Sequence, residues 1–155
     1  MPKKSDLMIL PVKVNLNEID EQGKNYRWPR PDFCGRCHGN RLWGHGFVET
    51  IFEGYRNALL IHRYRCPECG CIMKCRPDGY FPRFQSPKST IRSHIATRLG
   101  TGRWPPGIVK DVCRHWLRAL RRNAIAYLGL DWMNRLAEAF DRLIHMGIIP
   151  VSRGI

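Results

Sequence analysis

The residues of this sequence best suited to chemistry are two pairs of cysteines. Cys34 and Cys37 form the first pair and Cys66 and Cys69 the second, each with two residues between its members. That spacing lets both sulfurs of a pair face one ion, and zinc prefers four such thiolates in a tetrahedron. Gly70, directly after the second pair, suits the positive φ that such a turn needs. The sequence therefore predicts one structural Zn²⁺ bound by these four cysteines.

Paired cysteines also form disulfides, redox centres and iron–sulfur clusters. Disulfides conflict with a reducing cytosol, which the lack of a convincing secretory signal indicates. A thioredoxin-like motif opens a helix, whereas both pairs here lie among strand and turn residues. An iron–sulfur cluster is the alternative that stays open. A closed site of four thiolates has no position for water, so we expect it to stabilise structure and not to perform hydrolysis.

The three remaining cysteines are interpreted as buried side chains. Cys71 and Cys75 share one face of a predicted strand beside the metal site, and direct ligation by either is the alternative. Cys113 lies among apolar neighbours in a predicted helix. His38 and His45 are also of a ligand type, but four thiolates already suffice.

Basic side chains are the second group with a chemical consequence. The chain has 26 Lys and Arg against 13 Asp and Glu, a net charge of +13. This excess predicts an acidic partner, with nucleic acid first and an anionic membrane surface second. Between Lys88 and Arg122 only Asp111 is acidic. A solvated helix usually mixes both signs of charge, so we interpret this run as phosphate-binding, with an ordinary solvated face as the alternative.

The predicted contacts to nucleic acid lie on two helices and the linker between them. They are Arg92, Arg98, Arg103, Lys110, Arg114, Arg118, Arg121 and Arg122. Arginine can bind guanine through two hydrogen bonds, and both arginine and lysine bind phosphates. His115 and Asn123 are weaker candidates, and Trp104 and Trp116 are interpreted as core residues.

Short strands are expected to position the cysteines. Apolar runs at 47–52 and 58–65 predict a hairpin, and a third strand at 72–76 ends at the turn Pro77-Asp78-Gly79. Residues 7–16 alternate loosely and predict an edge strand, interrupted at Pro11. The segment 17–32 is polar, with Tyr26 and Trp28 as anchors onto the cysteine-rich region.

Helices are expected to position the basic residues. The first begins at Ser86-Pro87 and stops at Gly100. The second, from 108 to about 127, has the strongest apolar stripe: Val109, Val112, Cys113, Trp116, Leu117, Leu120 and Ala124. A third, capped by Asp131 and closed by Gly147, spans 131–146.

The expected fold class is α+β, with four regions along the chain. An N-terminal arm covers 1–33, and a small zinc ribbon of short antiparallel strands covers 34–85. A helix-turn-helix-like bundle of about three helices covers 86–147, and a tail covers 148–155. The linker between the first two helices is longer than the usual turn of three or four residues.

Several of these motifs resemble those of one family. They are Cys34-Gly-Arg-Cys37, His45-Gly46, the run from Ile61 to Gly70, the run from Pro77 to Pro82, and Trp-Leu-Arg-Ala-Leu-Arg-Arg at 116–122. Over about residues 34–127 the chain resembles the N-terminal zinc-ribbon and helix-turn-helix region of bacterial insertion-sequence transposases and related stand-alone transposase-like proteins. The resemblance implies that the paired cysteines bind zinc and that the helix bearing Arg114, Arg118 and Arg121 reads DNA.

The sequence departs from this family in its acidic residues. Such transposases also carry a catalytic domain with three metal-binding carboxylates. After residue 85 the acidic residues are Asp111, Asp131, Glu138 and Asp141, at positions that predict helix caps and surface side chains. We therefore expect no enzymatic activity.

The expected function is double-stranded DNA binding of mobile-element type, as a regulator or as an accessory to a recombinase or nuclease in the bacterial cytoplasm, associated with the nucleoid. RNA binding, or an adaptor role in a larger nucleic-acid-processing complex, is the alternative. The third helix can pack internally, the preferred interpretation, or form a homodimer on a palindromic site. Uncharged stretches reach about nine residues, against the roughly 20 that a membrane span needs.

Overall fold

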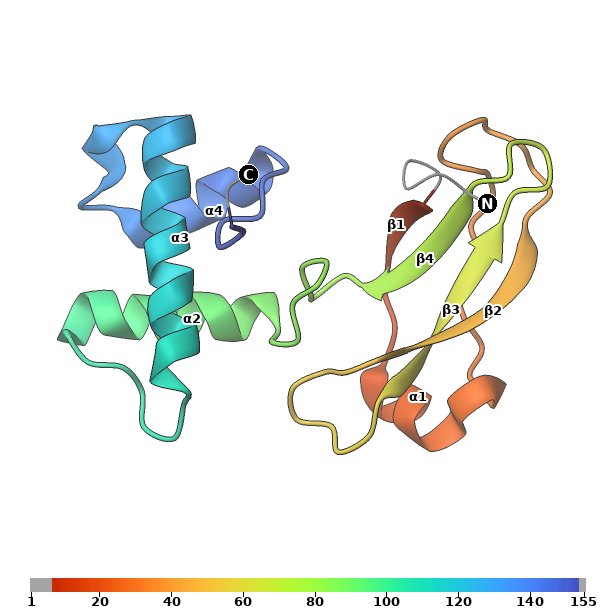
Figure 1. Ribbon diagram of the computed structural model, residues 1–155, viewed down its shortest axis with the longest axis horizontal. Coiled ribbons are helices and arrows are strands. Elements are labelled where there is room, and N and C mark those ends of the chain that lie inside the picture. Colours follow the sequence, from red (N-terminus) through yellow and green to blue (C-terminus); the bar gives the residue numbers. More distant parts are fainter. Residues whose placement is uncertain (1–6, 154–155) are drawn as a thin grey trace. The chain divides into compact units, whose positions relative to one another are not determined.

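The computed structural model describes residues 7–153 and divides the chain into two units, Met1–Ser86 and Pro87–Ile155 (Figure 1). The division lies one residue from the boundary expected between the ribbon and the helices. Within the expected N-terminal arm, residues 7–33 belong to the first unit and do not stand apart from it, while residues 1–6 lie outside the described part. The fold class is α+β, as expected.

The first unit is built on a four-stranded sheet in the order β1-β4-β3-β2. Its strands are β1 (Leu7–Val12), β2 (Trp43–Thr50), β3 (Leu59–Arg65) and β4 (Ile72–Pro77). The β2–β3 and β3–β4 pairs are antiparallel, as expected for a ribbon, whereas β1 pairs in parallel with β4. The prediction of an edge strand is confirmed for residues 7–12. The expected interruption at Pro11 is wrong, because β1 runs through Pro11 to Val12 and ends before residue 16, and an edge strand tolerates the missing N–H.

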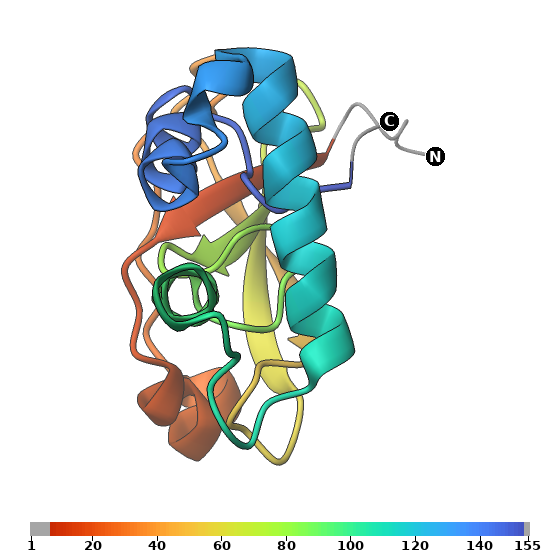
Figure 2. The same ribbon diagram turned by 90° about the vertical axis from the view of Figure 1, so that its left-hand side faces the viewer.

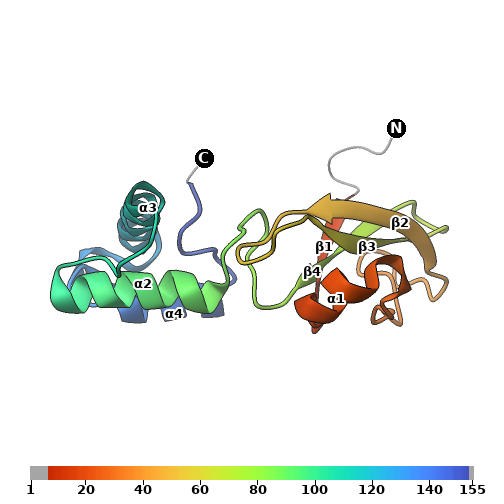
Figure 3. The ribbon, with the colours of Figure 1, turned by 90° about the horizontal axis from the view of Figure 1, so that it is seen from below.

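A short helix that the sequence did not predict lies against this sheet. Helix α1 (Leu16–Gln22) is followed by a 3-10 turn, η2 (Gly23–Asn25), and both lie on one side of the sheet (Figure 3). Asn15 caps α1 by accepting a hydrogen bond from the N–H of Glu18 at 3.2 Å. Ile19 is the buried residue of α1. Trp28, one of the expected anchors, follows the helix in sequence and is also buried.

The core of the first unit joins the sheet to the cysteine pairs. Cys34 and Cys66 are fully buried in the same cluster as Tyr64, Met73 and Cys75. Because these side chains share one apolar cluster, the turns that carry the cysteines are held against the sheet by packing as well as by the chain.

The second unit consists of helices α2 (Lys88–Thr101), α3 (Lys110–Leu128) and α4 (Leu136–His145), with a 3-10 turn η3 (Leu130–Trp132) before the last. Figure 2 looks along α2, with α3 crossing it. Each of the three helices contacts the other two, and the side chains they bury include Ile91, Ile95, Trp116, Leu120, Phe140 and Leu143. The expectation that the third helix packs internally is confirmed for its buried face.

Three helix boundaries differ from those expected. Helix α2 continues past Gly100, and Gly102, at φ 74°, ends it in the left-handed conformation. Its N-cap position is Pro87, without a side-chain cap hydrogen bond, so Ser86 does not cap it. Helix α4 begins at Leu136, since Asp131 belongs to the 3-10 turn that precedes it.

The apolar stripe of α3 is buried from Cys113 onward, and Cys113 is a core residue as expected. Val109 and Val112 are exposed, contrary to the predicted stripe. Val109 lies outside the helix, as its N-cap residue in an extended conformation. Within residues 7–153, the helices are too short or too polar to cross a membrane.

Candidate functional site

The two cysteine pairs adopt the same turn. After the first pair, the N–H of His38 donates to the carbonyl of Cys34 at 3.0 Å; after the second, the N–H of Gly70 donates to that of Cys66 at 2.9 Å. Each turn is closed by a second bond one residue further on, from Cys34 N–H to Gly39 at 2.8 Å and from Cys66 N–H to Cys71 at 2.9 Å. The site is therefore formed by two equivalent loops.

The residue after each pair has a positive φ. Gly70 adopts φ 75°, as the sequence predicted, and His38 adopts φ 60° at the equivalent position of the first loop. Left-handed backbone is unfavourable for a residue with a Cβ, so His38 is held there by the bonds that close its loop. His38 does not belong to the cluster of four ligand atoms.

The four predicted cysteines lie together. Their sulfur atoms are all within 4.8 Å of one another, close enough to bind one metal ion. The Sγ atoms of Cys34 and Cys69 are 3.6 Å apart, and those of Cys37 and Cys66 are 3.5 Å apart, so each close contact joins the two loops. All seven cysteines are free thiols, which contradicts the disulfide alternative.

Backbone N–H groups favour negative charge on these sulfurs. Burial raises the pKa of Cys34, but N–H donors from Cys37 and Arg36 outweigh it and bring the pKa to about 7. At Cys37 the N–H of Gly39 lowers the pKa, while the neighbouring Cys66 thiol and desolvation raise it, to about 12. Ionising one thiol thus opposes ionising the next, and a cation is needed to hold four thiolates this close together.

Cys71 and Cys75 lie beside the site and outside it. Both are fully buried, and neither belongs to the cluster of four sulfurs. Burial raises the pKa of Cys75 to about 11 and that of Cys71 above its usual value. These thiols therefore stay protonated at neutral pH, in agreement with their interpretation as small buried side chains.

The predicted nucleic-acid contacts of α3 share its exposed face. Lys110, Arg114, Arg118, Arg121 and Arg122 are all exposed, opposite the stripe that starts at Cys113. One acidic side chain accompanies them, since Asp111 lies 3.3 Å from Arg114. A pair this exposed neutralises little charge. The face therefore remains strongly cationic.

Residues from the α2–α3 linker extend this face around Trp104. Two hollows of about 270 and 280 Å³ lie here, both lined by Arg98, Trp104 and Arg114. Arg118 and Arg121 line the first hollow, and Arg103 and Lys110 line the second. The guanidinium of Arg98 lies 5.8 Å from the Trp104 ring, a cation–π contact that orients both groups. Trp104 is thus half-buried beneath cations, whereas Trp116 is a core residue as expected.

Two of the eight predicted basic residues lie apart from these hollows. Arg122 is exposed on α3 but does not line either hollow. Arg92 donates two hydrogen bonds, at 2.7 and 2.8 Å, to the carboxylate of Asp141 on α4. Because Asp141 already occupies two donors of the Arg92 guanidinium, we do not expect Arg92 to be among the stronger phosphate contacts.

Asn123 and His115, the weaker candidates for contacts to nucleic acid, form hydrogen bonds with the C-terminal segment. Asn123 is buried and donates to the carbonyls of Pro150 and Ser152 at 2.8 and 3.0 Å. His115 accepts a hydrogen bond from Arg153 at 2.8 Å. These bonds hold the predicted tail against α3 as far as residue 153. Because the side chain of Asn123 is buried, it is not available for a hydrogen bond to a base.

Comparison of this chain with protein-family models, with curated proteins and with solved structures finds no match.

Proposed function

We propose that this chain is a zinc-containing protein that binds double-stranded DNA through the cationic face of α3. We propose further that it acts as a regulator or accessory factor of transposase-like type, without a nuclease domain of its own, alongside a recombinase or nuclease. Pairing of two copies on a palindromic site belongs to the same proposal.

Zinc is supported by the spacing of the sulfurs. Zn–S bonds of about 2.3 Å in a tetrahedron place the sulfurs about 3.8 Å apart. The two short separations of 3.6 and 3.5 Å are close to this value, and no separation exceeds 4.8 Å. A cluster of several irons spaces its cysteines more widely, so the distances favour a single ion. When bound, zinc would supply a fixed cross-link between the two loops.

DNA binding is carried by one observation: six cations converge around Trp104 from α2, the linker and α3. They are Arg98, Arg103, Lys110, Arg114, Arg118 and Arg121. Like charges at this spacing repel, and a polyanion relieves that repulsion. An α-helix fits the major groove of B-DNA, and residues flanking it can bind the phosphates on either side. This arrangement favours duplex DNA over RNA, whose major groove is too narrow for a helix.

The test is a titration of the zinc-loaded chain with a labelled 20-base-pair duplex at several salt concentrations. Six phosphate contacts predict a slope of about −5 for log K against log salt. The double variant Arg118→Ala with Arg121→Ala is expected to bind at least tenfold more weakly, with unchanged zinc content. The control, Arg56→Ala with Arg142→Ala, removes the same charge from exposed positions elsewhere and is expected to bind within twofold of the parent.

The competing functions give different results in the same titration. Equal affinity for a folded RNA hairpin would replace the DNA proposal by RNA binding. A response to salt that is flat would favour an adaptor that binds protein, because phosphate contacts always release counterions.

A further inference from the structure

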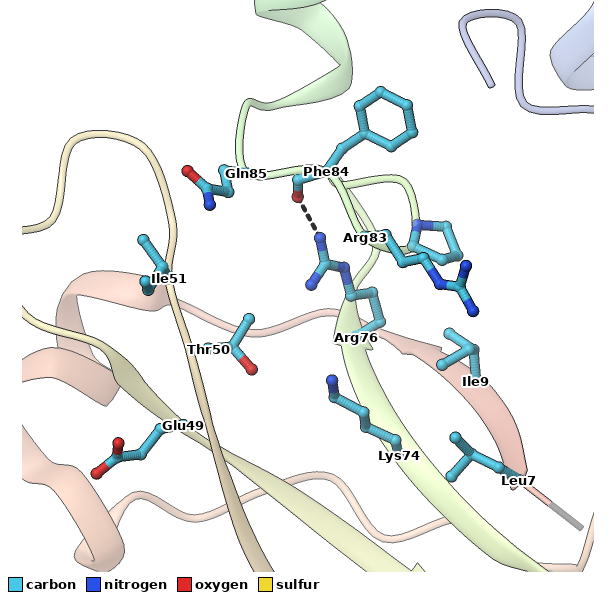
Figure 4. A pocket seen from close by; sticks show the side chains of 11 residues that line it. Leu7, Ile9, Glu49, Thr50, Ile51, Lys74, Arg76, Arg83, Phe84 and Gln85 are labelled. Carbon is cyan, nitrogen blue, oxygen red and sulfur yellow. Dashed lines mark hydrogen bonds between the residues drawn. The ribbon is translucent and has the colours of Figure 1, made fainter. Parts of the chain in front are cut away.

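The sheet of the first unit has a pocket on the face that carries Lys74 and Arg76. These residues alternate along β4 with the buried Met73 and Cys75, so they point to the other side of the sheet. The pocket measures about 630 Å³ and is drawn in Figure 4. Its volume lies within the range of small-molecule sites.

Cations gather at this pocket without carboxylate partners. Lys74 and Arg76 line it, and Arg63 faces Lys74 directly across the β3–β4 pair. Among residues 7–153, no carboxylate forms an ion pair with any of the three. Like charges placed directly opposite in a sheet are destabilising. Burial, and then the charges of Arg76 and Arg63, lower the pKa of Lys74.

Two polar side chains of the lining carry atoms that lack a partner. The Oγ1 of Thr50 and the Nε of Arg76 are buried and make no hydrogen bond within the described residues. Arg76 is only 5% exposed, and its Nη2 donates to the carbonyls of Phe81, at 2.8 Å, and Phe84 (Figure 4). Its guanidinium is therefore fixed in place with donor capacity to spare.

The remaining walls indicate what kind of anion would fit. Leu7, Ile9, Ile51 and Pro82 supply apolar surface beside the cations. The acidic residue of the lining, Glu49, is exposed, and its carboxylate points away from Lys74 in Figure 4. A ligand with a charged group at one end and an apolar body would satisfy both parts of the pocket.

We propose that this pocket binds a phosphorylated organic ligand of nucleotide size, with its phosphate on Lys74, Arg76 and Thr50. The phosphate accepts hydrogen bonds from the unpartnered donors and relieves the repulsion among the cations. The ligand is either a free nucleotide or the phosphorylated end of a strand. Every residue that lines this pocket belongs to the first unit, whereas α3 belongs to the second, so the proposal does not depend on the proposed DNA-binding face.

The test is calorimetric titration of the zinc-loaded full-length chain with deoxythymidine 5′-monophosphate, thymidine and inorganic phosphate. We expect the monophosphate to bind more tightly than either of the other two. Lys74→Met, which keeps the length of the side chain, is expected to weaken binding of the monophosphate at least tenfold. Thr50→Val is expected to weaken the same binding about threefold. The matched control is Lys24→Met, an exposed lysine on η2 away from the pocket lining, with an expected change below twofold.

Three results of this titration would overturn the proposal. Equal binding of thymidine would show that the phosphate is not recognised, and equal binding of inorganic phosphate would indicate an adventitious anion site. If Lys74→Met fails to fold, the isosteric Thr50→Val decides, and an unchanged affinity would reject the site. Arg118→Ala with Arg121→Ala is expected to leave nucleotide binding intact, which separates this proposal from the one on DNA.

The two sources of the phosphate are distinguished in that double-variant background. Tetrathymidylate with a 5′-phosphate is compared with the same strand ending in a hydroxyl and with the free monophosphate. Tighter binding of the phosphorylated strand than of the monophosphate would identify a strand end as the ligand. The reverse order would identify a free nucleotide.

Discussion

A substitution at Gly70 measures the free-energy cost of its left-handed backbone conformation alone, because a Cβ added there meets no atom within 4 Å. The only strain on Gly70→Ala comes from its φ of 75°, and left-handed backbone costs about 1–2 kcal/mol for a residue with a Cβ. We expect this loss in the free energy of unfolding of the metal-loaded protein, measured in urea. Gly79→Ala is the control, since Gly79 is equally open and lacks a positive φ. Equal losses in the two variants would contradict the argument.

The division between ligand and core cysteines is a second prediction for single residues. Cys66→Ser removes one of the four clustered sulfurs and is expected to weaken zinc binding more than about 100-fold. Cys75→Ala removes a buried thiol outside the cluster and is expected to keep one zinc per chain, at a cost of about 1–2 kcal/mol for the cavity. Metal content after dialysis against a weak chelator is the measurement. Loss of zinc from Cys75→Ala would place that residue among the ligands.

At the scale of elements, α3 does more than present cations, because its buried Asn123 binds the C-terminal segment. Asn123→Ala leaves the carbonyls of Pro150 and Ser152 without their donors, and Pro150 is buried. We expect a loss of about 1–3 kcal/mol in the free energy of unfolding, with faster hydrogen exchange at the amide of Ser152. Asn134→Ala, at an exposed position, is the control. Slow exchange retained in Asn123→Ala would mean that other contacts hold this segment.

The elements differ in how far sequence could predict them. The cysteine loops and α3 were predictable because their signals are local: a two-residue spacing and a long apolar stripe. Helix α1 was missed because it buries Ile19 alone and is otherwise polar or only partly buried, so its pattern is too short for a periodicity. The pocket lined by Lys74 and Arg76 was not predicted. It depends on the strand register that places Arg63 opposite Lys74, and on the loop whose carbonyls at Phe81 and Phe84 bind Arg76. Register is a property of the paired strands, not of one segment.

For the whole molecule, the two units differ in what stabilises them. Loss of the metal would disturb the core of the first unit, because Cys34 and Cys66 lie inside it, whereas the core of the second unit contains none of the four clustered cysteines. Chelation of zinc is therefore expected to collapse the amide dispersion of residues 34–77 in an NMR spectrum while the signals of α2, α3 and α4 persist. Simultaneous loss of both sets would show that the helical unit depends on the metal, and retention of both would remove the structural role proposed for zinc.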